Sequence, residues 1–394
     1  MGIQKFWKNS PEFLSDKSVR QLIGFAGKGK LADGNDTSLE FRALLSEVSS
    51  DHLARYADEC LTESFTDSGL ALQDIINEVG RRLGFEVVNG HYRGRVGAIG
   101  NDGLWRLPND HKIVLEVKTT DAYRFDLKTF AGYRTELIRA GKIAAENSSV
   151  LIVVGRSDTG DLEAQVRGSQ FAWDMRLISV DALLRLARLN ESIDDPDALR
   201  RIYEILIPRE FTKLDGIVEL VFSTAENSQE PLDVAPVEVQ IAEGLLVETK
   251  KFTPVSFNDK VAGNLSSSLG VPLIKRTRTL FSSPDDAIKA ICVVSKEYDP
   301  GDHAGYWFAF HPHQKDVLEK TQRGYAAFGC GSPNFIVCVP IKDLSEWTAG
   351  MNKTVGENEK FYWHIQISMD AGKPVLVRKK GQPRIDLSRY RIQA

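Results

Sequence analysis

A nearly continuous apolar run at residues 149–155, SVLIVVG, constrains the fold of this chain more than any other feature. Such a run is typical of a strand that is covered on both faces, as in the parallel sheets of α/β proteins. Around it, helix-like and strand-like segments alternate in the order α–β–β–β–α–β–β–α between about residues 66 and 190. We therefore predict an α/β domain in which helices flank a mixed sheet.

The segments of this domain have clear sequence signals. Its opening helix is predicted over 70–85, with apolar residues on one stripe and Gly84 as a stop signal. A second helix is predicted over 126–141 and ends at Gly141. The three strand-like runs between them are FEVVNG, RGRVGAIG and HKIVLEVKTT.

Composition shifts divide the rest of the chain. Residues 1–65 are predicted to form a helical N-terminal region, which includes a long helical pattern over 38–61. The α/β domain is assigned to 66–221, and the polar segment 222–240 with its prolines is predicted to be a linker. Residues 241–394 contain many short strand-like runs, which predict a C-terminal α+β domain.

Charge and cysteine content narrow the setting of the protein. The formal net charge of −4 shows no global basic field, although a basic face for nucleic acid is compatible with it. The four cysteines form no C-x-x-C pair, which is typical of a reducing cytoplasm. No secretory signal and no run of about 20 apolar residues is present, so we expect a cytoplasmic protein without membrane contact.

The strand 111–120 carries a charged pair that apolar residues surround. Because side chains alternate along a strand, Glu116 and Lys118 share one face. Asp102 precedes Glu116 by 14 positions, a distance that suits an antiparallel neighbour joined by a turn at LPNDH. Burying such charges is costly unless they pair or bind a metal.

These residue types match the needs of phosphodiester hydrolysis. A hard cation offsets charge on the phosphate and lowers the pKa of a water, and Mg²⁺ uses few carboxylates. We expect Asp102, Glu116 and the carbonyl of Val117 to bind Mg²⁺, for which Mn²⁺ could substitute. Lys118 would orient the attacking water or stabilise developing charge, and a pKa depressed by burial would add proton transfer.

The pattern D-G-(x)12-E-V-K resembles the signature of the PD-(D/E)XK superfamily of restriction-endonuclease-like nucleases. The chain has Asn101 where the signature has proline, and the resemblance covers about residues 66–190. It implies an αβββαβ core and a DNA endonuclease in restriction or phage defence. It also implies a homodimer, because many nucleases of this fold dimerise to cut both strands.

The resemblance further implies a metal-proximal acid on the opening helix. Asp74 and Glu78 share a face there, and Glu78 is the predicted catalytic acid because it lies nearer the sheet-facing end. A solvated helix face is the alternative for both. For the central triad the alternative is an exposed ion-pair ladder, but the apolar flanks and Gly97, Gly100 and Gly103 favour a ligand site.

Further nucleic-acid contacts are predicted outside the triad. Arg134 could clamp a phosphate, and Lys275, Arg276 and Arg278 form a basic run in the C-terminal domain. Aromatic and histidine residues at 306–313 and 361–364 suggest a domain that reads unstacked bases, with core packing as the alternative. A repair or recombination nuclease and a non-catalytic nucleic-acid-binding subunit are the competing functions.

Overall fold

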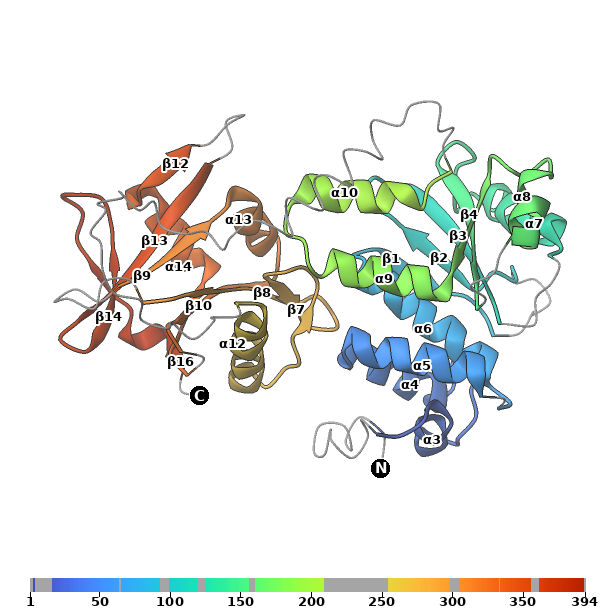
Figure 1. Cartoon of the computed structure of the whole chain (residues 1–394), viewed down its shortest axis with the longest axis horizontal. Helices are drawn as coiled ribbons and strands as arrows, with labels where there is room; N and C mark the ends of the chain where they lie inside the picture. The colour runs from blue at the N-terminus through green and yellow to red at the C-terminus, as the bar shows by residue number, and fades with distance from the viewer. Residues whose placement is uncertain are drawn as a thin grey trace, which may run out of the picture. The chain divides into compact units, whose positions relative to one another are not determined.

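The chain divides into two compact units, Met1–Thr224 and Ala225–Ala394 (Figure 1). This computed structural model describes residue 3 and residues 16–63, 65–92, 99–119, 125–155, 160–208, 254–297, 305–332, 334–355 and 361–392. The predicted linker 222–240 therefore lies outside the described residues. In the part of the chain that the structure describes, no helix is long and apolar enough to cross a membrane.

The N-terminal helices pack into the first unit. They are α3 (Val19–Phe25), α4 (Asp36–Glu47) and α5 (Ser50–Thr62). The single helical pattern expected over 38–61 is two helices, because the chain is extended at Val48 and the Ser49 side chain caps α5. Apolar residues of all three helices share one core with the sheet, so the region 1–65 belongs to the same unit.

Helix α6 (Ser68–Arg82) lies between these helices and the sheet (Figure 1). It ends as the sequence predicted, with Gly84 at a φ of +84°. The helix is buried on nearly all sides, because α4 and α5 cover the face that the sheet leaves open. Its polar residues therefore need partners inside the protein.

The sheet of the first unit is mixed, as predicted. Its strands lie in the order β1-β2-β3-β4-β5, and the first three are antiparallel while β3, β4 and β5 are parallel. The strands are β1 (Glu86–Asn89), β2 (Gly103–Arg106), β3 (Lys112–Lys118), β4 (Ser148–Val154) and β5 (Met175–Ser179). The second strand lies after the expected RGRVGAIG run, whose residues 93–98 fall outside the described residues.

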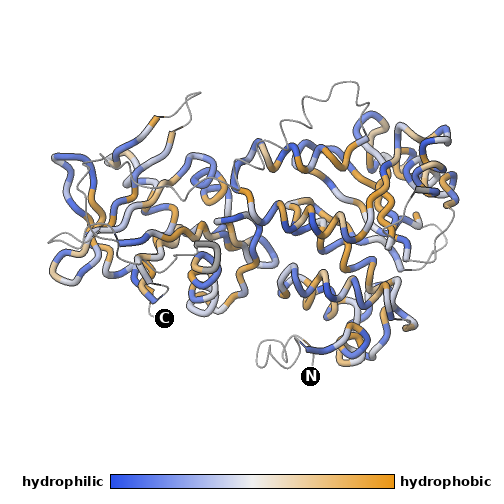
Figure 2. The backbone as a smooth tube through the Cα atoms, in the orientation of Figure 1, coloured by the Kyte–Doolittle hydropathy of each residue, from blue (hydrophilic) through white to orange (hydrophobic). Residues whose placement is uncertain are grey.

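Each face of this sheet has its own core. Ile113, Leu115 and Val117 of β3 point to α6, and Val114 points to the other face. β4 is buried along its whole length, which confirms the expectation from its apolar run, and its hydrophobic colour is visible in Figure 2. The helices on the Val114 face are α7 (Leu127–Arg139) and α8 (Gly160–Arg167), whereas α9 (Val180–Asn190) packs beside α6 and leads to α10 (Pro196–Ile205).

The second unit has two sheets with an aromatic core between them. Helix α12 (Pro254–Leu269) covers the outer face of the first of these sheets. That sheet contains β6 (Ile274–Lys275), β7 (Leu280–Ser282), β8 (Ile288–Ser295), β10 (Arg323–Cys330), β11 (Ile336–Pro340) and β16 (Arg391–Ile392). The other contains β9 (Gly305–Phe310), β12 (Lys353–Val355), β13 (Phe361–Asp370), β14 (Lys373–Val377) and β15 (Ile385–Asp386). Two further helices are α13 (Pro312–Glu319) and α14 (Ile341–Trp347).

Candidate functional site

Asp102 lies beside the end of β3, immediately before β2. Its backbone N–H donates to the carbonyl of Leu115 at 3.0 Å, which continues the antiparallel pairing of β2 with β3. Its Oδ2 atom accepts a hydrogen bond of 2.7 Å from the backbone N–H of Val117. The predicted pairing across the LPNDH turn is therefore confirmed, and it places the carboxylate of Asp102 against the end of β3.

Glu116 and Lys118 project from β3 toward helix α7. They share the face of Val114, whose side chain packs in the α7 core. The ammonium of Lys118 donates to Oε1 of Glu116, and the Lys118 Nζ atom lies 5.3 Å from the centre of the Phe130 ring. The pairing and the ring hold Lys118 at the carboxylate.

Burial dominates the electrostatics of the two acids. It raises the pKa of Glu116 to about 7, with help from the negative charge of Asp102 and against the charge of Lys118. Burial also raises the pKa of Asp102 to about 6, although the Val117 N–H and Lys118 oppose it. Both carboxylates thus hold protons more tightly than in water, a state that an added cation would reverse.

Lys118 remains charged at this position. Burial lowers the pKa of its ammonium, but Glu116 and Asp102 more than offset that effect, and the net shift is upward. The condition that we set for proton transfer, a depressed pKa, is therefore not met. The side chain is 36% exposed, so its charge is available to a ligand.

One oxygen in this group is buried without a hydrogen-bond partner among the described residues. It is the Oε2 atom of Glu116, a residue that is 5% exposed. The N–H and C=O of one strand residue point to the same edge, so the Val117 carbonyl faces the side on which Asp102 lies. Two carboxylates and one carbonyl are oxygen donors of the kind that Mg²⁺ takes, with its remaining positions left to water. The residues present fit that ion.

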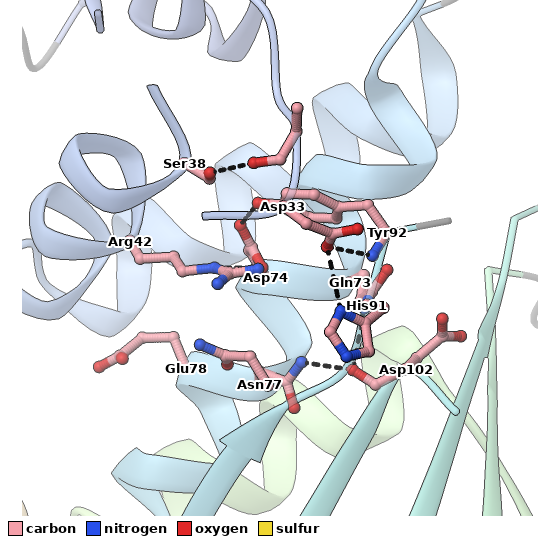
Figure 3. Close-up of polar contacts among 12 residues, drawn as sticks. Asp33, Ser38, Arg42, Gln73, Asp74, Asn77, Glu78, His91, Tyr92 and Asp102 are labelled. Carbon is pink, nitrogen blue, oxygen red and sulfur yellow. Dashed lines mark hydrogen bonds and ion pairs between the residues drawn. The ribbon is translucent and has the colours of Figure 1, made fainter. Parts of the chain in front are cut away.

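Two amides of α6 bind the main chain of Asp102. Gln73 Nε2 and Asn77 Nδ2 donate to the Asp102 carbonyl oxygen at 3.0 and 2.9 Å (Figure 3). Both side chains are buried. Neither amide was predicted to belong to the site, although their spacing of four positions puts both on one face of α6.

Glu78, the predicted helix acid, does not join the site. Its carboxylate forms ion pairs with Arg82 at 2.9 Å and with Arg81 at 3.3 Å, and the side chain points away from Asp102 in Figure 3. Asp74 is also committed elsewhere, to Arg42 at 2.9 Å and to the Tyr92 hydroxyl. Among the described residues, no group of three or more acidic, histidine or cysteine side chains could hold a metal ion. Neither acid lies on a solvated face, because both are buried.

Tyr133 of α7 borders the site. A Cβ atom at Gly100 would lie 3.1 Å from the Tyr133 hydroxyl oxygen, so this phenol rests against the backbone two residues before Asp102. Burial raises the pKa of Tyr133, and the charges of Glu116, Lys118 and Asp102 all act on it. Among the described residues its hydroxyl has no hydrogen-bond partner, which leaves a donor at the edge of the site.

The predicted phosphate-binding cations have partners within the protein. Arg134 donates to the Ser148 hydroxyl at 3.0 Å and pairs with Asp174 at 3.3 Å. Lys275 pairs with Asp259 at 3.1 Å. Arg276 donates to the Ser282 hydroxyl at 2.7 Å, and Arg278 is half-buried near it in sequence. A role of these cations in nucleic-acid binding stays a prediction.

The C-terminal aromatic residues are partly in the core and partly half-buried. Phe308, Phe310 and Trp363 belong to the core between the two sheets, as the packing alternative proposed. Trp307 and His364 are half-buried, and the Trp307 indole donates to His364 Nδ1 at 3.1 Å. The expected base-reading role is therefore open only to the half-buried members.

No protein-family model matches this chain, and no curated protein matches it.

Proposed function

We propose that this protein is a metal-dependent DNA endonuclease of the PD-(D/E)XK type. The observation that carries the proposal is the group at the end of β3. Two buried carboxylates with raised pKa values share it with one ammonium, and one carboxylate oxygen has no partner in the part of the chain that the structure describes. Buried charges of this kind are uncommon in a purely structural role, because each costs free energy.

The order of elements supports the same proposal. α6, β1, β2, β3, α7 and β4 follow each other as an αβββαβ unit, with β1 to β3 antiparallel and β4 parallel to β3. This is the arrangement that the resemblance implies for a restriction-endonuclease-like core. The signature residues lie where β2 and β3 bring them together.

The residues have distinct tasks in this proposal. Asp102, Glu116 and the carbonyl of Val117 hold Mg²⁺, which when bound offsets phosphate charge and lowers the pKa of a water. Lys118 is a charged donor whose exposed end contacts a phosphate oxygen and stabilises the charge that develops there. Glu116 keeps Lys118 in place through their hydrogen bond.

The biological role and assembly rest on the resemblance. We propose restriction or phage defence as the setting and a homodimer as the form that cuts both strands. Mn²⁺ is expected to replace Mg²⁺, because both accept octahedral oxygen ligands.

Incubation of the purified protein with supercoiled plasmid tests this proposal. Mg²⁺ should convert the plasmid to nicked and linear forms, while EDTA or Lys118→Ala should prevent it. Trp173→Ala provides a matched control, because Trp173 is 66% exposed and makes no part of the site. Cutting that survives both EDTA and Lys118→Ala would refute the mechanism, and no cutting by the wild type with Mg²⁺ or Mn²⁺ would refute the function.

A further inference from the structure

The carbonyl oxygen of Asp102 receives more hydrogen bonds than a backbone carbonyl ordinarily does. It accepts from the Gly90 N–H at 3.0 Å, from Gln73 Nε2 at 3.0 Å and from Asn77 Nδ2 at 2.9 Å. A carbonyl oxygen has only two lone pairs. Three converging donors therefore restrict the direction of this peptide more than a sheet ladder alone would do.

The Asn77 amide can take only one orientation. The Trp105 indole, which is a donor only, donates to Asn77 Oδ1 at 2.9 Å. The amide nitrogen of Asn77 must then face Asp102. The residue after Asp102 is Gly103, where a Cβ atom would lie 2.2 Å from Asn77 Oδ1, so the fit leaves no room for a side chain.

Neighbouring polar residues on α6 show what a purely structural role looks like. Asp74 and Glu78 are equally buried, but they pair with arginines and do not contact Asp102. Gln73 and Asn77 alternate with them along the helix and bind only the β1 to β3 side. The neutral amides of Gln73 and Asn77 thus donate hydrogen bonds to the Asp102 peptide, whereas Asp74 and Glu78 form ion pairs with arginines.

We infer that Gln73 and Asn77 are positioning residues, which turn the Asp102 carboxylate toward Val117 and Glu116 by fixing the Asp102 peptide. The inference rests on the proposed function, because it concerns the same metal site. Asp102 lies outside β2, and the main chain holds its peptide through one hydrogen bond from its N–H to Leu115 and one from the Gly90 N–H to its carbonyl. Without the amides the carbonyl would keep only Gly90 as a partner, and the orientation of the carboxylate would depend on its single hydrogen bond from the Val117 N–H.

Two substitutions remove these hydrogen-bond donors almost without changing side-chain size. Asn77→Asp and Gln73→Glu each place a carboxylate oxygen against the Asp102 carbonyl. We expect Mn²⁺ affinity and kcat each to fall by about 10- to 100-fold, the loss typical of partners that orient metal ligands, with KM for DNA little changed. Asn258→Asp is the matched control, because Asn258 is also a buried amide but lies on α12 in the second unit.

The test titrates Mn²⁺ alone into each full-length protein by calorimetry, then measures cleavage and the melting temperature. Weaker Mn²⁺ binding by every one of the two α6 variants that folds, with wild-type affinity in Asn258→Asp, supports the inference. Wild-type Mn²⁺ affinity in a folded Asn77→Asp or Gln73→Glu overturns it, even if the melting temperature falls. Gln73→Glu keeps the test decisive if Asn77→Asp does not fold, because Gln73 has no second bond to Trp105.

The same titration separates this inference from the proposed function. A wild type that binds Mn²⁺ but cuts no DNA refutes the nuclease function, while the two variants still decide the positioning role. A wild type that binds no Mn²⁺ overturns both.

Discussion

Two groups of charged residues were predicted to act on nucleic acid, and they differ in how completely they are paired inside the protein. At the end of β3, one buried oxygen of Glu116 has no partner among the residues with described positions, and Glu116 and Asp102 both have raised pKa values. In the second unit, Lys275 and Arg276 are paired with acids of their own unit and are 22% and 12% exposed in their side chains. The first group can bind a cation without losing an existing partner of that oxygen, whereas Lys275 and Arg276 would have to give up ion pairs to bind a ligand.

The difference shows why residue type alone is a weak guide to a binding site. A charged side chain that already has partners must lose them before it meets a ligand, which cancels much of the gain. A buried carboxylate without a full set of partners gains from an added cation.

Glu116→Gln should reduce DNA cleavage by about 10³-fold, because it removes the proposed metal ligand and changes the charged partner of Lys118 into a neutral one. It should also raise the free energy of unfolding of the metal-free protein at pH 8. The raised pKa of Glu116 means that folding is favoured while the acid is protonated, and this stability is lost as pH rises through about 7. Plasmid cleavage and urea unfolding in EDTA check both effects. A Glu116→Gln variant that cuts DNA at the wild-type rate would show that the charged group at the end of β3 does not serve cleavage.

Asp74→Asn should change how stability depends on pH. Burial raises the pKa of Asp74 to about 6, against the pull of Arg42. The free energy of unfolding of the wild type should therefore lose up to about 3 kcal/mol between pH 4 and pH 7, as Asp74 ionises inside the protein. Urea unfolding at both pH values should show a smaller loss in Asp74→Asn. Asp58→Asn provides a control, because Asp58 is exposed. An equal loss of stability in the wild type and in Asp74→Asn would contradict the prediction.

Tyr133→Phe should lower cleavage by about 10-fold while leaving the melting temperature unchanged. The Tyr133 hydroxyl has no partner among the described residues, and under the proposed function it would donate one hydrogen bond to a charged oxygen of the substrate. Steady-state kinetics on a labelled duplex measure the effect. A wild-type cleavage rate in Tyr133→Phe would contradict the prediction that the Tyr133 hydroxyl contacts the substrate.

Lys275→Ala should have the smallest effect, less than about threefold on cleavage and less than about 1 kcal/mol on stability. Its ammonium is held by Asp259 and lies over the Phe281 ring, so it has little to offer DNA. The measurements are the same kinetics and a urea titration. A loss above 10-fold would show that paired cations of the second unit still reach the substrate.

Much of the first unit follows from local patterns. The burial of β4, the mixed sheet, the ends of α6 and α7 and the meeting of Asp102 with β3 were all predictable, since strand alternation and glycine stops depend on near neighbours. The strand β2 was not predicted, because its four residues form too short a pattern, and most of the expected run RGRVGAIG before it lies outside the described residues.

The sequence by itself determined the α/β character of this protein and the pairing of Glu116 with Lys118, because the period of a strand puts both side chains on one face. Only the tertiary structure decided which side of α6 serves the site. Glu78 and Asn77 are adjacent in the sequence, yet Arg82 binds the first and the Asp102 peptide meets the second. A polar side chain in a buried helix is assigned by the partners that packing brings to it, and those partners come from distant segments of the chain.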